Sequence, residues 1–172
     1  MDDRLQQKRV PNRVLTAGIR YSQAEALIKS LMQDEKFRKL SLPERSRVTE
    51  RILDEVKRRM LEDIVLLETK LRRKDCEVFK LQFAAGEFDM VVFNPSLGTA
   101  EIYEIKHSMT QAKEHYKHLI DRKKCSETAF RYGDITGKYV IYRGETAVFA
   151  DTTTESAEIT YINVEEYLKK LM

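Results

Sequence analysis

Apolar residues recur with a helical period in the first half of the chain. The longest such pattern runs from about Ser41 to about Arg73, and in its first part the apolar positions are four residues apart. These positions are Val48, Ile52, Val56 and Met60. The capping box Ser41-Leu-Pro-Glu44 predicts the beginning of this helix. A second box, Ser22-Gln-Ala-Glu25, predicts a shorter helix before it, to about Lys36.

The pattern changes in the second part of the long helix. From Met60 to Leu71 the apolar residues spread around most of the helix circumference. A helix that is apolar on all sides is expected to be buried. Glu62 and Glu68 lie within this apolar surface, and a buried carboxylate needs a partner or a function. Helical phase alone leaves both glutamates open as candidate functional residues.

Three extended runs follow the long helix, at residues 77–83, 87–93 and 100–106. The turn Asn94-Pro-Ser-Leu-Gly98 joins the second and third runs as a hairpin. Further along the chain, the patterns predict a capped helix from residue 108 to about 121 with more helix to about 130, strands at 138–142, 145–149 and 158–162, and a helix at 163–171. This order predicts an α/β domain whose mixed sheet contains the antiparallel hairpin and a strand added through a crossover helix.

Composition fits a globular protein with abundant helix, because 42% of the 172 residues are apolar and 34% are charged. No apolar run approaches the roughly 20 residues that span a bilayer, so no membrane partner is expected. The N-terminus lacks a signal peptide's apolar segment, and the two cysteines are most simply reduced thiols, so a cytoplasmic location is expected. Residues 1–40 are interpreted as a basic arm with a short helical extension, and residues 41–172 as the main domain.

Charge is distributed unevenly along the chain. Residues 1–75 contain 19 Lys and Arg against 13 Asp and Glu, whereas the net charge of the whole chain is only +3. A basic N-terminal part beside a more acidic remainder suits nucleic-acid binding. Solvated helix surfaces of mixed charge explain the same distribution equally well.

Asp89, Glu104 and Lys106 are the strongest candidates for chemistry. Residues two apart on a strand share a face, so Glu104 and Lys106 project together, and Asp89 can join them from the neighbouring strand. Two carboxylates and a lysine can hold Mg²⁺ and activate a water molecule against a phosphodiester. The alternative is an ordinary salt bridge on a solvated strand face.

The order of elements, with an Asp in the second strand and Glu-x-Lys in the third, resembles the PD-(D/E)xK nuclease superfamily. Within it, the chain looks most like the nuclease-like C-terminal domain of prokaryotic AAA-type ATPases. The matching segments are Met60-Leu-Glu-Asp-Ile-Val65, Glu87-Phe-Asp-Met-Val91 and Tyr103-Glu-Ile-Lys106. The chain lacks the proline that this family places before the aspartate. The resemblance implies a restriction-endonuclease-like core of a long helix, a three-strand meander, a crossover helix and a further strand.

The resemblance also implies a role for each site residue. Asp89, Glu104 and the carbonyl of Ile105 would bind Mg²⁺ or Mn²⁺, and Lys106 would orient or deprotonate the attacking water. Glu62 would complete the site from the helix, in preference to the second helix glutamate. The implied activity is a metal-dependent deoxyribonuclease. The alternative is a catalytically inactive module that binds nucleic acid or a protein partner and is associated with an AAA-type ATPase.

Weaker patterns lie after the third strand. His107 points away from Lys106 if the strand continues, and Gln111 and Tyr116 miss by one residue the Gln-x-x-x-Tyr motif of some superfamily members. Two histidines and a cysteine could hold zinc, although a solvated helix face is the simpler interpretation; they are His115, His118 and Cys125. Five basic residues could contact a nucleic-acid backbone: Lys113, Lys117, Arg122, Lys123 and Lys124.

Overall fold

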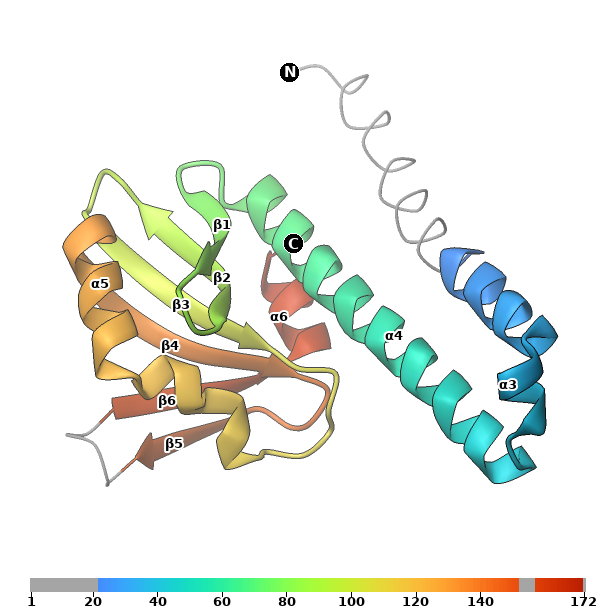
Figure 1. The fold of residues 1–172 in the computed structure, drawn as a ribbon. Helices are drawn as coiled ribbons and strands as arrows, with labels where there is room; N and C mark the ends of the chain where they lie inside the picture. The colour runs from blue at the N-terminus through green and yellow to red at the C-terminus, as the bar shows by residue number, and fades with distance from the viewer. Residues whose placement is uncertain (1–21, 152–156, 172) are drawn as a thin grey trace, which may run out of the picture. The chain divides into compact units, whose positions relative to one another are not determined.

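The computed structural model describes residues 22–151 and 157–171 of the chain, which divides into two compact units (Figure 1). The first unit is Met1–Met60 and the second is Leu61–Met172. The long helix α4 (Leu42–Arg72) belongs to both, because the division falls within it. The domain boundary after residue 40 stays a prediction from the sequence.

In the first unit, residues 22–33 are helical and α3 (Glu35–Lys39) follows after a break. The sequence predicts one helix to about Lys36, but Asp34 interrupts it, because its carboxylate accepts a hydrogen bond of 2.9 Å from the Phe37 N–H and starts a new helix. The start of α4 is as predicted. The Glu44 carboxylate there accepts hydrogen bonds from both the backbone N–H and the hydroxyl of Ser41.

The second unit is built on a six-stranded mixed sheet with the strand order β1-β2-β3-β4-β6-β5 (Figure 1). The strands are β1 (Glu77–Gln82), β2 (Glu87–Asn94), β3 (Thr99–Ile105), β4 (Asp134–Tyr142), β5 (Ala147–Asp151) and β6 (Ala157–Asn163). The first three form an antiparallel meander, β4 pairs parallel to β3, β6 pairs parallel to β4, and β5 pairs antiparallel to β6. The mixed α/β architecture, with its antiparallel hairpin and added parallel strand, is confirmed.

The crossover from β3 to β4 contains η1 (Lys113–Ile120), a 3-10 helix, and α5 (Arg122–Tyr132). The helix start predicted at Ser108 is wrong. The Ser108 hydroxyl accepts a hydrogen bond from the Thr110 N–H in a local turn, and the Gln111 side chain donates to the hydroxyl of Tyr142. Both side chains are thus engaged outside a helix, and helical structure begins only at η1.

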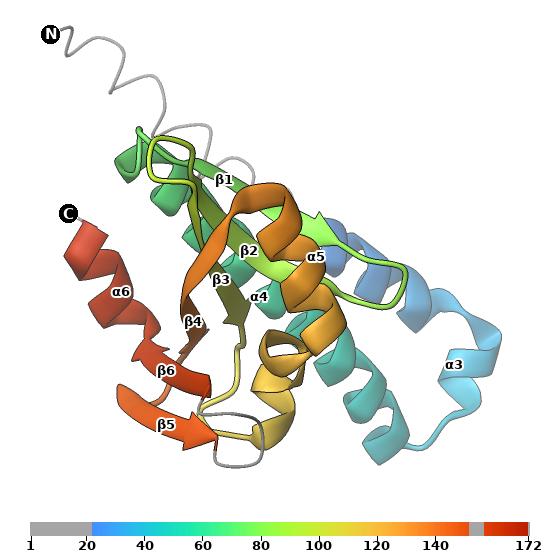
Figure 2. The same ribbon diagram turned by 90° about the vertical axis from the view of Figure 1, so that its left-hand side faces the viewer.

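Helices cover both faces of the sheet (Figures 1 and 2). One face packs against α6 (Val164–Leu171) and the part of α4 that lies in the second unit, and the other packs against η1 and α5. The cluster on the α4 side includes Val65, Met90, Ile105, Ile141 and Tyr167. The cluster on the η1 side includes Phe88, Ile102, Leu119, Val140 and Tyr161. The strands β1, β2, β3, β4 and β6 therefore contribute residues to both cores.

The C-terminal part of α4 is buried on one side only. Its buried residues are Glu62, Val65 and Thr69, whereas Ile64 is 40% exposed and Leu67 is 36% exposed. The prediction of a helix buried on all sides is therefore wrong. Among the described residues, no helix combines the length and apolar character needed to cross a membrane.

Candidate functional site

Asp89 lies where β2 and β3 stop pairing. The ladder between these strands reaches only the Met90–Tyr103 pair, and the neighbouring β1–β2 ladder shifts register at the same level, between Phe79 and Leu81. The Asp89 Oδ2 atom accepts a hydrogen bond of 2.7 Å from the Ile105 N–H. At the end of β3, the Ile105 N–H thus donates to the side chain of Asp89, where a continued ladder would provide a main-chain carbonyl of β2.

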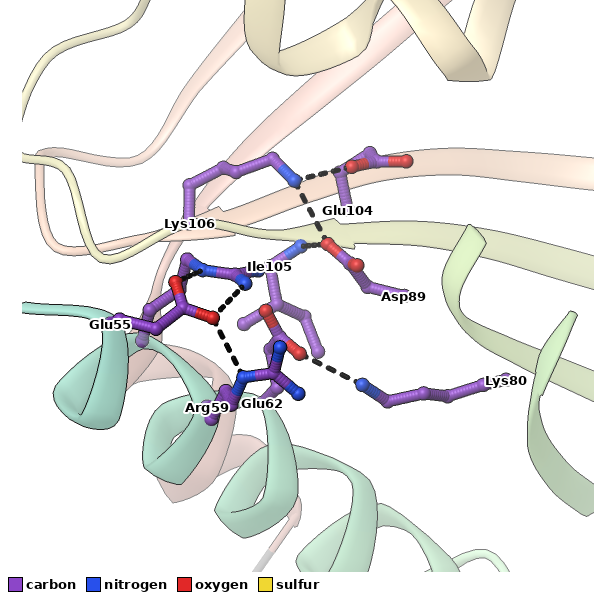
Figure 3. Close-up of polar contacts among 9 residues, drawn as sticks. Glu55, Arg59, Glu62, Lys80, Asp89, Glu104, Ile105 and Lys106 are labelled. Atoms are coloured by element: carbon purple, nitrogen blue, oxygen red, sulfur yellow. Dashed lines mark hydrogen bonds and ion pairs between the residues drawn. The ribbon is translucent and has the colours of Figure 1, made fainter. Parts of the chain in front are cut away.

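Lys106 joins Asp89 to Glu104 (Figure 3). Its Nζ atom lies 3.0 Å from Asp89 Oδ2 and 2.5 Å from Glu104 Oε2. Asp89 is 4% exposed and Glu104 is 1% exposed, so both carboxylates are removed from solvent. The structure therefore brings together the three residues on which the site prediction depends, with two buried carboxylates sharing one ammonium group.

The electrostatics of Glu104 differ from those of an ordinary salt bridge. Burial, and next the negative charge of Asp89, raise the pKa of Glu104 to about 8, although Lys106 acts in the opposite direction. Burial also acts to lower the pKa of Lys106, but the two carboxylates outweigh it and the pKa is raised. The Oε1 atom of Glu104 is buried and makes no hydrogen bond. Glu104 thus holds an acceptor atom that the protein itself does not satisfy.

Glu62 lies on the buried side of α4 and approaches the site through Lys80. Its Oε2 atom lies 2.8 Å from Lys80 Nζ, and the residue is 3% exposed (Figure 3). Burial acts to lower the pKa of Lys80, but the pKa is raised because Glu62, Glu87 and Asp89 stabilise its positive charge. Glu68 is half-buried. Burial and the connection to Asp89 through Lys80 therefore favour Glu62 over Glu68.

Lys80 is a residue of the site that the sequence analysis missed. Lys80 follows Val78 by two residues on β1, so the two side chains share a face of the sheet. Val78 is buried in the cluster on the α4 side of the sheet. A lysine on the inward-facing side of a strand was the available signal. The register of β1 against β2 was needed to place it beside Asp89.

Four of the weaker candidates make contacts outside the carboxylate cluster. The rings of Tyr116 and Tyr161 pack perpendicular to each other in the core, while Gln111 donates a hydrogen bond to Tyr142. The His107 ring lies 3.5 Å from the Arg143 guanidinium, and Cys125 donates a hydrogen bond through its thiol to the Leu119 carbonyl. The structure thus provides these side chains with contacts outside the carboxylate cluster.

The donor atoms of the cluster fit a hard divalent cation. No three His, Cys, Asp or Glu side chains are grouped as a metal site within residues 22–151 and 157–171. Asp89 and Glu104 nevertheless provide two carboxylates, one with an unsatisfied oxygen, and the Lys106 ammonium already lies between them as a monovalent cation. Carboxylates, main-chain carbonyls and waters are the ligands that Mg²⁺ prefers.

The carbonyl of Ile105 is a further potential ligand. The N–H of Ile105 points to the β2 side, where it meets Asp89, whereas the next N–H, that of Lys106, points to Ile141 on the β4 side. Within a strand, the N–H and the carbonyl of one residue point to the same neighbour. The Ile105 carbonyl is therefore expected on the side of Asp89.

Comparisons with known proteins do not assign a family. No protein-family model matches the chain, and no curated protein matches it. The likeness to the PD-(D/E)xK superfamily stays a prediction from the motif and the order of elements.

Proposed function

We propose that the second unit is a metal-dependent nuclease or nuclease-like domain that hydrolyses phosphodiester bonds of DNA. The observation that carries this proposal is the pair of buried carboxylates, Asp89 and Glu104, which share Lys106 and leave one Glu104 oxygen unsatisfied. A restriction-endonuclease-like core is part of the same proposal. It is supported by the succession of α4, a three-strand meander, a crossover through η1 and α5, and the parallel strand β4.

The residues of the cluster have distinct roles in this proposal. Asp89 is held in place by the Ile105 N–H and presents its carboxylate at the end of β2. Glu104 would hold the cation as a carboxylate and would release its proton to solvent, because metal ligands act in their deprotonated form. Bound Mg²⁺ or Mn²⁺ supplies a Lewis acid that lowers the pKa of a water ligand and neutralises charge on the phosphate.

Lys106 has the most direct role in the reaction. Its ammonium can turn from the carboxylates toward the scissile phosphate, where it orients the attacking water and donates to the oxygen on which negative charge develops. Glu62, held by Lys80, adds negative charge on the α4 side of Asp89.

A second candidate function is a catalytically inactive module that binds nucleic acid or a protein partner such as an AAA-type ATPase. The ion pairs of Lys106 with both carboxylates favour it, because a half-buried lysine already supplies positive charge at the position a cation would take. In that case the cluster stabilises the separated ends of β2 and β3 and performs no chemistry.

Plasmid cleavage in Mg²⁺ or Mn²⁺ tests the first proposal. The wild-type protein is expected to cut, and Lys106→Ala to be at least about 100-fold slower, the usual effect of losing one acid–base group. Lys170→Ala is a matched control, because Lys170 is an exposed lysine on α6. Equal residual cleavage by Lys106→Ala and the wild type would overturn the role of Lys106.

Calorimetric titration with Mn²⁺ separates the two candidates. Binding heat that is present in the wild type and absent in Asp89→Asn supports the metal-dependent nuclease. DNA binding without cation uptake or cleavage supports the inactive module.

A further inference from the structure

A nearly buried lysine lies beside the candidate site without a carboxylate partner. Lys124, on α5, is 7% exposed. Its Nζ atom lies 2.5 Å from His118 Nδ1 and 5.5 Å from the centre of the Phe83 ring. Among the described residues, no Asp or Glu forms an ion pair with this ammonium. The imidazole nitrogen and the aromatic ring contact this ammonium but do not neutralise its charge, and a buried charge without a counter-charge is unfavourable.

His118 lies between Lys124 and the carboxylate cluster in its electrostatic interactions. Burial and the charges of Lys124 and Lys106 lower the pKa of His118, whereas Asp89 acts in the opposite direction. His118 is thus close enough to interact electrostatically with both the lysine on α5 and the cluster. Because Nδ1 accepts from the Lys124 ammonium, the proton of the neutral ring is on Nε2, which can donate to a ligand.

The turn between β1 and β2 leaves room for the pair. Gly86 has a φ of 83°, and a Cβ atom at this position would lie 2.9 Å from His118 Cε1 and 3.0 Å from Lys124 Nζ. Any side chain here would therefore displace the imidazole or the ammonium. The glycine allows the main chain to approach both groups closely.

We propose that Lys124 and His118 form a subsite for a backbone phosphate of the nucleic acid whose scissile phosphodiester lies at Asp89 and Lys106. A phosphate oxygen supplies the negative charge that Lys124 lacks, and it accepts hydrogen bonds from both Nζ and Nε2. The subsite rests on the proposed function for the identity of its ligand. It differs from the exposed lysines of η1 and α5 because its ammonium is held in one place by burial.

Binding of a short labelled DNA duplex in EDTA, followed by fluorescence anisotropy, tests the subsite without any cleavage. Lys124→Met keeps the aliphatic contact with Phe83 and removes the charge. It is expected to weaken binding about tenfold and to reduce the slope of log K against log salt by about 1. Lys170→Met, which makes the same change in net charge on α6, is expected to change affinity by less than about twofold.

A thermal melt of each variant separates binding from a structural role. In the protein without DNA, the buried Lys124 ammonium has no counter-charge, and methionine of similar volume removes that unfavourable charge. The Tm of Lys124→Met is therefore expected to equal or exceed that of the wild type. Lower Tm with unchanged DNA affinity would show that Lys124 only supports the fold, and the proposal would fall. Equal affinity of the two methionine variants, or no DNA binding by the wild type in EDTA, would also overturn it.

These outcomes are independent of the nuclease assay. DNA binding that depends on Lys124, in a protein that does not cleave plasmid, rejects the nuclease and keeps the subsite. Plasmid cleavage with unchanged affinity in Lys124→Met rejects the subsite and keeps the nuclease.

Discussion

At the scale of single residues, the two carboxylates of the cluster are not equivalent. The Oδ2 atom of Asp89 accepts hydrogen bonds from the Ile105 N–H and from Lys106. Glu104 has Lys106 on one oxygen and no partner on the other. Burial and the negative charge of Asp89 raise the pKa of this glutamate.

Glu104 makes the stability of the cation-free protein depend on pH. Its pKa is about 8 in the folded protein against 4.5 for an unperturbed glutamate, so the folded state binds more protons between these values. The contribution of Glu104 to the free energy of unfolding is therefore largest below pH 4.5, and it falls as the pH rises to about 8. Glu104→Gln, which stays neutral, is expected to remove this component.

Urea unfolding in EDTA at a series of pH values measures the effect. The free energy of unfolding of the wild type, relative to Glu104→Gln, should decrease by at least about 1.4 kcal/mol across this range, the equivalent of one pKa unit. Parallel pH curves for the two proteins would contradict the raised pKa.

At the scale of secondary-structure elements, two connections set the point at which β3 and β4 begin to pair. They are the hairpin turn before β3 and the end of α5 before β4. Gly133 ends α5 with φ 79° and ψ −165°, a conformation essentially restricted to glycine. The next residue, Asp134, donates its N–H to the Gly98 carbonyl, which starts the parallel pairing of β4 with β3. The hairpin turn and the helix end therefore meet at one point.

Alanine substitution at these two glycines should have unequal effects. At Gly133 an added Cβ would overlap the Gly98 carbonyl oxygen, whereas at Gly98, with φ 61°, it would meet nothing within 4 Å. Gly98→Ala is expected to cost about 1 kcal/mol from backbone conformation alone. Gly133→Ala is expected to cost about 3 kcal/mol or more, because the overlap adds to the strain. Urea unfolding of both variants checks this, and equal losses would contradict the close approach of the two turns.

At the scale of the second unit as a whole, stability depends on two cores separated by the sheet. Val65 of α4 and Leu119 of η1 are both fully buried, the first in the cluster on the α4 side and the second in the cluster on the η1 side. Neither cluster contains residues of the other, so the two faces can be perturbed independently.

Truncation on each face should therefore be additive. Val65→Ala is expected to destabilise by about 2 kcal/mol and Leu119→Ala by about 3 kcal/mol. The double variant should lose the sum within about 0.5 kcal/mol, as for sites that share no partners. Urea unfolding measures all three, and a coupling energy well above this value would show that the two faces are not independent.

Local signals in the sequence predicted most elements correctly. The Ser41 box, the turn at Asn94–Gly98 and the Asn163 cap each act within a few residues, and the structure shows the corresponding hydrogen bonds. The Ser108 box failed because Gln111 has a distant partner, Tyr142, that competes with the helix start. A capping pattern contains no information about such a competitor.

The sequence by itself determined the hairpin, the order of its carboxylates and lysine, and the mixed α/β character, because strand alternation and turn chemistry are local properties. Only the tertiary structure decided that Asp89 takes the end of β3 as its hydrogen-bond partner, that Lys80 links Glu62 to the site, and that Lys124 is buried beside His118. Each of these contacts joins residues of two different elements, and the first also depends on where the ladder between β2 and β3 ends. Burial and charge compensation, which give the cluster its properties, arise only when those segments pack together.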